Sequence, residues 1–339
     1  MLSSFYVYGD KVVEMKELSN PDSIHVDQNN IYITEFPHIY IYSKIDFSLK
    51  QKFGGKGEGP GEFLKYTMIY IHRDQLLISD RNKVSYFSKG GKYIKQLKAQ
   101  SLAQWGVIPL GDKFVGKSRK TINKIDYDTA VLYSPDLKKE KEIYHYKFFY
   151  TLLKGSKRCN AVEIRGIQFH TFAGKMFVKG KEGFTIDVLD MDGNRLDRIT
   201  RDYEKVKITE ADKIRYQEYF QTTRPWKRLY DEYIKKEIFF PEYFPAIRQF
   251  LVIDNKIYVL TFKTLGDKAQ FIILNLKGKL IKEVYLPFDN SDKWFHYSLY
   301  ENVAHRILNG GFTIKDGKLF RLFENPDSEV WELHITEIR

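Results

Sequence analysis

The feature that most constrains this sequence is a pattern of short apolar strands that recurs six times, at intervals of about 40–60 residues apart from a longer gap between the fourth and fifth copies. The second strand of each copy is the clearest, and the copies lie at 31–33, 76–78, 113–115, 175–178, 257–259 and 319–322. Turn residues (Gly, Asp or Asn) precede each copy, as tight hairpins require. One such module cannot bury both of its faces, so the pattern predicts the stacked blades of a β-propeller.

A run rich in glycine, FGGKGEGPGEF at 53–63, lies between the first two copies. Five glycines and Pro60 exclude a helix there. We expect a tight turn that leads from the outer strand of one blade to the inner strand of the next. Glu58 and Glu62 would accept hydrogen bonds from backbone N–H groups in this turn. The run is not a phosphate-binding loop, because it lacks the G-K-[ST] ending and a following helix.

The last copy supplies three strands, at 311–315, 318–323 and 330–335, and lacks a fourth. The alternating segment 11–18 precedes the first copy. We therefore predict that this segment completes the last blade and joins the two ends of the chain. The predicted fold is an all-β six-bladed propeller that spans residues 1–339 as a single domain, and we expect a monomer.

One stretch, 209–236, departs from the strand pattern. Thr209 precedes two acidic residues, as at a helix N-terminus, and Thr223 begins a second possible helix. We predict a helical insertion between blades four and five, either as a lid that packs by its aromatic residues or as a cover for a ligand or partner. Its polar positions are the densest basic cluster of the chain: Lys213, Arg215, Arg224, Lys227, Arg228, Lys235 and Lys236.

Composition limits the classes of function. The formal net charge of +11 fits an anionic partner, such as nucleic acid, a glycan or a membrane surface, and it equally fits a soluble surface rich in lysine. No apolar run approaches the roughly 20 residues of a membrane span. Residues 1–8 show no signal peptide, so we expect either an intracellular protein or one whose export signal lies elsewhere. Cys159 is the single cysteine, so no internal disulfide can form.

The chain shows no local catalytic or metal-binding motif. Its eight histidines are scattered, and no two have the i, i+2 or i, i+4 spacing of metal chelation. A G-x-S-x-G elbow is absent from the sequence. We therefore predict no catalytic residue, no metal and no cofactor.

The phase of the repeats selects a candidate binding surface. In a propeller, the loops between second and third strands share one face with the links between blades. Basic residues at these loops and at the starts of the inner strands therefore approach one axial face, and arginine there suits carboxylate, sulfate or phosphate. The candidate ligand-binding residues are Arg81, Arg119, Arg165, Lys179, Arg248, Lys263 and Arg306.

The segment 78–92 reads apolar-x-D-x-N-x-apolar-x-x-F followed by a glycine turn. Together with the run at 53–63 and the stretch FPEYFPAI at 240–247, it resembles the six-bladed NHL/TolB-like propellers of Bacteroidetes. The resemblance implies a propeller of unassigned function, in a family whose members are often exported or lipoproteins. It supplies no catalytic residue to transfer.

These observations favour a non-catalytic recognition or scaffold module that presents one axial face to a protein partner or to an anionic small molecule or glycan. Two alternatives stay open. One is a propeller hydrolase or lyase that acts on a glycan or small ester, and the other is an NHL-like nucleic-acid binder. A nucleic-acid binder needs a basic track with stacking aromatics, and no recognisable motif of that kind is present.

Overall fold

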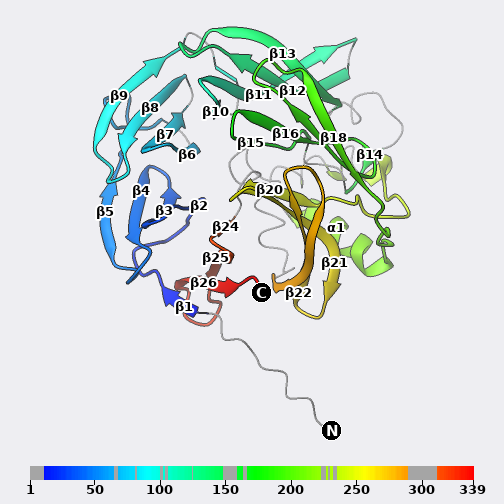
Figure 1. Ribbon diagram of the computed structural model, residues 1–339. Coiled ribbons are helices and arrows are strands. Elements are labelled where there is room, and N and C mark those ends of the chain that lie inside the picture. Colours follow the sequence, from blue (N-terminus) through cyan, green and yellow to red (C-terminus); the bar gives the residue numbers. More distant parts are fainter. Residues whose placement is uncertain are drawn as a thin grey trace.

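Six four-stranded antiparallel sheets stand around a central axis, as Figure 1 shows. The computed structural model describes residues 11–64, 68–80, 82–99, 102–103, 106–123, 125–147, 159–162, 166–222, 227, 230–231, 235–288 and 311–339. Blades that are consecutive in the chain contact each other through their innermost strands, and the last blade contacts the first. The sequence prediction of a six-bladed propeller is thereby confirmed.

The first three blades follow one another in the first part of the chain. Blade one consists of β2 (Ser23–Val26), β3 (Asn30–Glu35), β4 (His38–Ser43) and β5 (Leu49–Phe53). Blade two consists of β6 (Met68–His72), β7 (Gln75–Asp80), β8 (Lys83–Ser88) and β9 (Tyr93–Lys98). Blade three consists of β10 (Val107–Leu110), β11 (Lys113–Ile122), β12 (Ile125–Tyr133) and β13 (Lys139–Lys147).

The remaining blades follow the same order. Blade four consists of β15 (Phe169–Phe172), β16 (Lys175–Lys179), β17 (Phe184–Leu189) and β18 (Arg195–Arg201). Blade five consists of β20 (Gln249–Ile253), β21 (Lys256–Leu265), β22 (Lys268–Asn275) and β23 (Leu280–Pro287). Blade six consists of β24 (Phe312–Lys315), β25 (Lys318–Glu324), β26 (Trp331–Glu337) and, as its outer strand, β1 (Lys11–Glu14).

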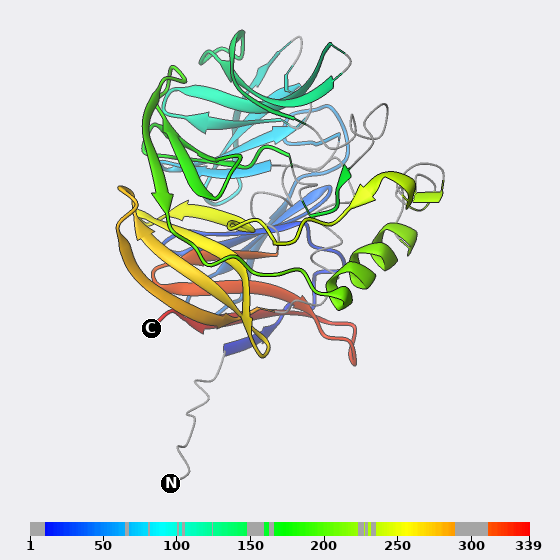
Figure 2. The same ribbon diagram turned by 90° about the vertical axis from the view of Figure 1, so that its right-hand side faces the viewer.

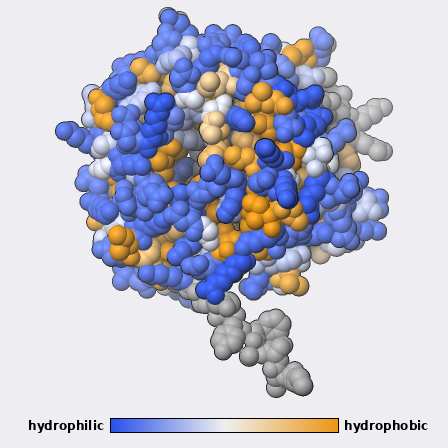
Figure 3. Space-filling model, in the orientation of Figure 1, coloured by the Kyte–Doolittle hydropathy of each residue, from blue (hydrophilic) through white to orange (hydrophobic). Residues whose placement is uncertain are grey.

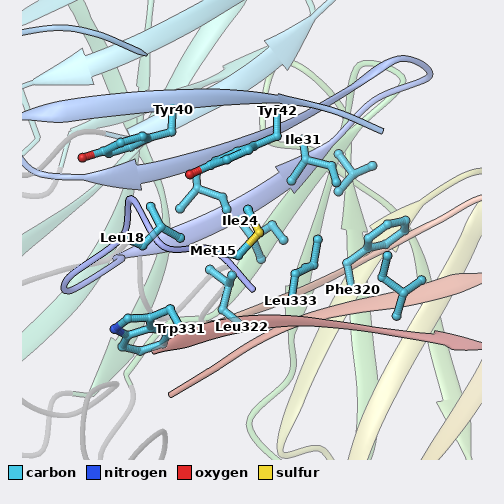
Figure 4. Packing of buried hydrophobic residues seen from close by; sticks show 13 residues of the cluster. Met15, Leu18, Ile24, Ile31, Tyr40, Tyr42, Phe320, Leu322, Trp331 and Leu333 are labelled. Atoms are coloured by element: carbon cyan, nitrogen blue, oxygen red, sulfur yellow. The ribbon is translucent and has the colours of Figure 1, made fainter. Parts of the chain in front are cut away.

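The two ends of the chain close the ring. The strand β1 pairs antiparallel with β26, with Val13 opposite Leu333, and the Met15 N–H donates to the Trp331 carbonyl at 2.7 Å. Figure 4 shows the apolar cluster that this closure buries between blades six and one, in which Met15 lies close to Leu333. The sequence prediction for residues 11–18 is therefore confirmed, and packing across the seam joins the N-terminal strand to both neighbouring blades.

The glycine-rich link forms the predicted turn between β5 and β6. The Gly59 N–H donates to the Glu62 carboxylate at 2.8 Å, as expected for Glu62, and the Phe63 N–H donates to the Gly55 carbonyl at 2.7 Å. Gly54 has a φ of +93°, and a Cβ there would lie 2.7 Å from the Pro37 carbonyl oxygen. Only glycine fits such a backbone at so close an approach.

A helical segment interrupts the connection between blades four and five. The helix α1 (Glu210–Thr222) begins after Thr209, whose hydroxyl accepts from the Asp212 N–H at 3.2 Å while the Asp212 carboxylate accepts from the Thr209 N–H at 2.9 Å. This reciprocal cap satisfies two backbone donors at the helix start. Tyr216, Tyr219 and Phe220 are buried beneath the helix.

The rest of the predicted insertion is described only in part. The segments that begin at Thr223 fall mostly outside the described residues, and the chain returns through α3 (Lys235–Glu237) and β19 (Ile238–Phe239). The strand β19 pairs in parallel with β14 (Cys159–Asn160), outside the ring.

The two flat sides of the propeller carry different connections. We call the side on which second strands lead into third strands, and on which blades are linked, the linker face. Because α1 stands in the link between β18 and β20, it lies on the linker face, where Figure 2 shows it projecting from one side of the disc. Figure 3 shows the opposite face, which has a hydrophilic rim with apolar side chains gathered nearer the middle.

Candidate functional site

A pocket of about 330 Å³ lies on the linker face, between α1 and blade five. We call it the arginine pocket. Arg215 of α1 and Arg248, which directly precedes β20, both line it. Its other polar lining residues are Lys207, Thr209, Asp212 and Thr264, and its apolar walls are Val206, Tyr216, Phe244 and Phe262.

Arg248 is held in place by its backbone and by aromatic rings. Its N–H donates to the Leu260 carbonyl at 3.0 Å, and its own carbonyl accepts from the Gln168 side chain at 3.4 Å. The guanidinium carbon lies 5.6 Å from the Phe262 ring centre and 5.8 Å from that of Phe288. These cation–π contacts orient a half-buried guanidinium whose flat fork suits a bidentate anion.

Arg215 reaches the pocket from the first turns of α1. Its Nη2 lies 2.6 Å from Asp212 Oδ1, and the Asp212 Oδ2 accepts from both the N–H and the hydroxyl of Thr209. Asp212 therefore links the helix cap to the arginine, and the fold of the helix start fixes the position of this second guanidinium.

The apolar wall of the pocket is a stack of two rings from separate segments. Phe244 and Phe262 lie with ring centres 4.4 Å apart and planes within 10°. The Phe244 N–H donates to the Val206 carbonyl at 2.8 Å, so its segment is also fixed by backbone pairing. Among the described lining residues, three are cationic, Lys207, Arg215 and Arg248, and one is a carboxylate, Asp212. The described lining thus combines a positive excess with a flat apolar wall.

A second pocket of about 380 Å³ adjoins the first, and we call it the outer pocket. Phe244 lines both. The two pockets meet at a short antiparallel pairing in which Lys207 stands opposite Tyr243 and the Ile208 N–H donates to the Glu242 carbonyl at 3.0 Å. Tyr203, Lys205 and Tyr243 are among the residues that line the outer pocket.

The structure distributes the candidate residues from the sequence over different environments. Arg248 lines the arginine pocket. Lys263 instead pairs with Glu204 at 2.7 Å and lies over the Tyr203 ring at 5.2 Å, and the Glu204 carboxylate raises the pKa of Lys263. Lys179 ends β16, where its N–H donates to the Gln168 carbonyl. Arg81, Arg165 and Arg306 lie outside the described residues.

Arg119 belongs to an ion cluster within blade three. Its Nη2 lies 3.5 Å from Asp128 Oδ1, and Lys117 Nζ lies 2.8 Å from Asp128 Oδ2. The Asp128 side chain is fully buried, and that of Lys117 is 8 % exposed. Gly166 packs so closely that a Cβ there would meet the Asp128 carboxylate. Arg119 and Lys117 therefore share the task of neutralising a buried carboxylate.

The inner strands bring two histidines towards the axis. His25 lies on β2 of blade one and His170 on β15 of blade four, at opposite positions of the ring. Burial, and secondly the charge of His170, lower the pKa of His25 from its usual 6.5 to about 3. His25 is therefore neutral at physiological pH. Within the described ranges, no group of three or more His, Cys, Asp or Glu side chains could hold a metal ion.

Comparison with known proteins identifies the fold and no more. No protein-family profile and no curated protein match the sequence. A presumed exported protein from Bacteroides fragilis NCTC 9343 has a similar structure, with a TM-score of 0.54 at 13 % identity over 98 % of this chain and 95 % of that one.

The chain shares the six-bladed propeller fold of a Bacteroides protein. A DUF4221 protein from Bacteroides vulgatus ATCC 8482 also matches, with a TM-score of 0.48 at 9 % identity over 97 % of both chains. In the part of the chain that the structure describes, no helix has the length and apolar character to cross a membrane.

Two basic residues of the arginine pocket, Arg215 and Lys207, were not among the sequence candidates. Arg215 was noted in the basic cluster of the insertion, and Lys207 was not singled out. The sequence does carry a signal for Arg215, because a Thr-x-x-Asp cap at Thr209 fixes the helix phase and Arg215 follows Asp212 by three positions. Lys207 carries no such signal, since its position depends on pairing with Tyr243 far along the chain.

Proposed function

We propose that this protein is a non-catalytic recognition propeller that binds an anionic ligand on its linker face, in the arginine pocket. Arg248 and Arg215 bind the anionic group, and Lys207 adds positive charge at the rim. The ring stack of Phe244 and Phe262 receives a flat apolar part of the ligand. We also propose that the protein acts as a monomer and that it is related to the NHL/TolB-like propellers.

The observation that carries this proposal is the environment of Arg248. Its guanidinium is oriented by the rings of Phe262 and Phe288, and Arg248 lines the arginine pocket. Because the site is preorganised, a ligand loses little binding free energy to ordering the side chain. A charge-assisted hydrogen bond contributes about 1.5–3 kcal/mol, so loss of Arg248 should be measurable.

A thermal-shift screen tests the proposal, because a ligand of the native state raises the unfolding midpoint. The probes are benzoate and galacturonate, each beside its neutral counterpart, benzyl alcohol and galactose. We expect the acids to raise the midpoint of the wild type and the neutral compounds to leave it unchanged. Equal shifts with acid and neutral probes, or equal shifts in Arg248→Ala, would contradict the proposal.

A further inference from the structure

The outer pocket differs in charge from the arginine pocket beside it. Asp202 and Glu242 stand beside Arg201 and Lys205 among its described lining residues, and Arg201 is also paired with Glu283 at 2.7 Å. These described residues therefore give the outer pocket no positive excess. A pocket of this kind with many hydrogen-bonding groups favours a neutral polar ligand over an anion.

Tyr243 gives the outer pocket an accessible aromatic surface. Its side chain is 38 % exposed, and Lys205 Nζ lies 5.7 Å from its ring centre. Tyr203 also lines the pocket, and its ring centre lies 6.0 Å from that of Phe184, which is buried at 3 % exposure. The apolar C–H face of a sugar ring stacks on such a surface, while its hydroxyls reach carboxylate, amide and ammonium groups around it.

The two pockets are adjacent subsites because they share a wall. Phe244 is only 7 % exposed and lines both, and the antiparallel pairing of Val206 and Ile208 with the 242–244 segment fixes that wall. A ligand with two linked rings would have to reach over this wall to place one ring in each pocket. The ring in the arginine pocket must carry an acidic group, and the other ring needs none.

We propose that the ligand is an acidic oligosaccharide, with a sugar ring stacked on Tyr243 in the outer pocket and the carboxylate or sulfate of the adjoining sugar bound by Arg248 and Arg215. This inference rests on the proposed function of the arginine pocket and extends it to the outer pocket. The outer pocket contributes affinity for the second ring, and the arginine pocket contributes the selectivity for acid.

Isothermal titration with matched probes tests the inference. Galacturonate fills the arginine pocket alone, and galacturonosyl-galactose, whose second ring is neutral, fills both pockets. A galactose disaccharide with one sulfate replaces carboxylate by sulfate, cellobiose is neutral, and tri-glutamate supplies the acid on a peptide. We expect galacturonosyl-galactose or the sulfated disaccharide to bind at least fivefold more tightly than galacturonate. Cellobiose and tri-glutamate should bind more weakly than either disaccharide acid.

The variant Tyr243→Ala separates this inference from the proposed function. It should lower the affinity for the acidic disaccharide about five- to tenfold and leave galacturonate binding unchanged. The control is Tyr86→Ala on blade two. Like Tyr243, Tyr86 has a lysine ammonium over its ring, at 4.9 Å from the ring centre, but it lines neither pocket. It should change neither affinity.

The outcomes lead to different conclusions. If galacturonate binds and depends on Arg248, but the disaccharide gains nothing or ignores Tyr243→Ala, the inference fails and the proposed function stands. If tri-glutamate binds best, a peptide replaces the oligosaccharide and the inference fails. If no acid binds the wild type, both the inference and the proposed function fail.

Discussion

Phe244 and Phe262 stack in parallel with ring centres 4.4 Å apart, although one belongs to the return from the helical insertion and the other to a strand of blade five. This contact connects the insertion to the ring of blades. Both rings line the arginine pocket, as do Arg215 of α1 and Arg248. The insertion therefore contributes half of the candidate site as well as covering that part of the propeller.

The helix cap should control ligand binding because it positions Arg215 within the arginine pocket. In Asp212→Ala, both the hydrogen bonds to Thr209 and the ion pair with Arg215 are lost. We expect a loss of about 1 kcal/mol in the free energy of unfolding, as for other helix caps, and a weaker affinity for galacturonate. Urea unfolding and titration measure the two effects. Glu210→Ala, which removes an exposed acid from the same turn, is the control and should leave affinity unchanged within twofold.

Closure of the ring should depend on the buried N-terminal contact. Met15 is 1 % exposed within the seam between blades six and one, so Met15→Ala leaves a cavity there. We expect the free energy of unfolding to fall by about 2–5 kcal/mol. Val12 in the same strand is 48 % exposed, and Val12→Ala should cost under about 0.5 kcal/mol in denaturant melts. Similar losses from both variants would show that the seam does not hold the ring closed.

The ion cluster of blade three should respond unequally to loss of its members. Asp128 neutralises both Lys117 and Arg119, so Asp128→Asn leaves the nearly buried Lys117 ammonium without its carboxylate. We expect a loss of about 3–5 kcal/mol in stability. Lys117→Met should cost less, because Arg119 stays near the carboxylate. Chemical denaturation ranks the variants, and a larger loss from Lys117→Met would contradict this assignment.

Stability should fall in mild acid because of His25. Its pKa is lowered from 6.5 to about 3 in the folded chain, so the unfolded chain binds a proton at a pH where the folded chain does not. The stabilising contribution of neutral His25 is fully present above about pH 6.5 and is lost as the pH falls towards 3. The loss between pH 6.5 and 5 is about 2 kcal/mol. Denaturant melts across this range should show a shallower decline in His25→Gln, and an unchanged slope would refute the assignment.

The sequence predicted the ring well, because each blade has a local signature. Gly, Asp and Asn set the turns before the second strands. The last copy of the repeat lacks a fourth strand, and the alternating segment 11–18 was therefore predicted to supply it. Both inferences need only the order of strands along the chain. The positive φ at Asp254 and Asn255, ahead of β21, is one instance of such local turn chemistry.

The candidate site was predicted only in part, because it depends on contacts between distant segments. Arg248 was expected at the linker face from the phase of the repeats, and it lines the pocket there. The repeat phase also selected Arg119 and Lys263. It could not reveal the Asp128 and Glu204 carboxylates that pair with them, since strand register and the path of a link between blades decide those partners. The ligand-binding roles of Lys179, Arg81, Arg165 and Arg306 stay predictions.

The claim that the arginine pocket binds the ligand is tested most directly by comparing two variants, Arg248→Ala and Arg195→Ala. The affinity of each variant for galacturonate is measured by isothermal titration at the same ionic strength. Arg195 is exposed on β18 and lines neither pocket, so both variants lose the same charge. We predict at least a tenfold loss of affinity, about 1.4 kcal/mol, in Arg248→Ala and no change beyond twofold in Arg195→Ala. Equal affinities in the two variants would contradict the arginine pocket as the binding site.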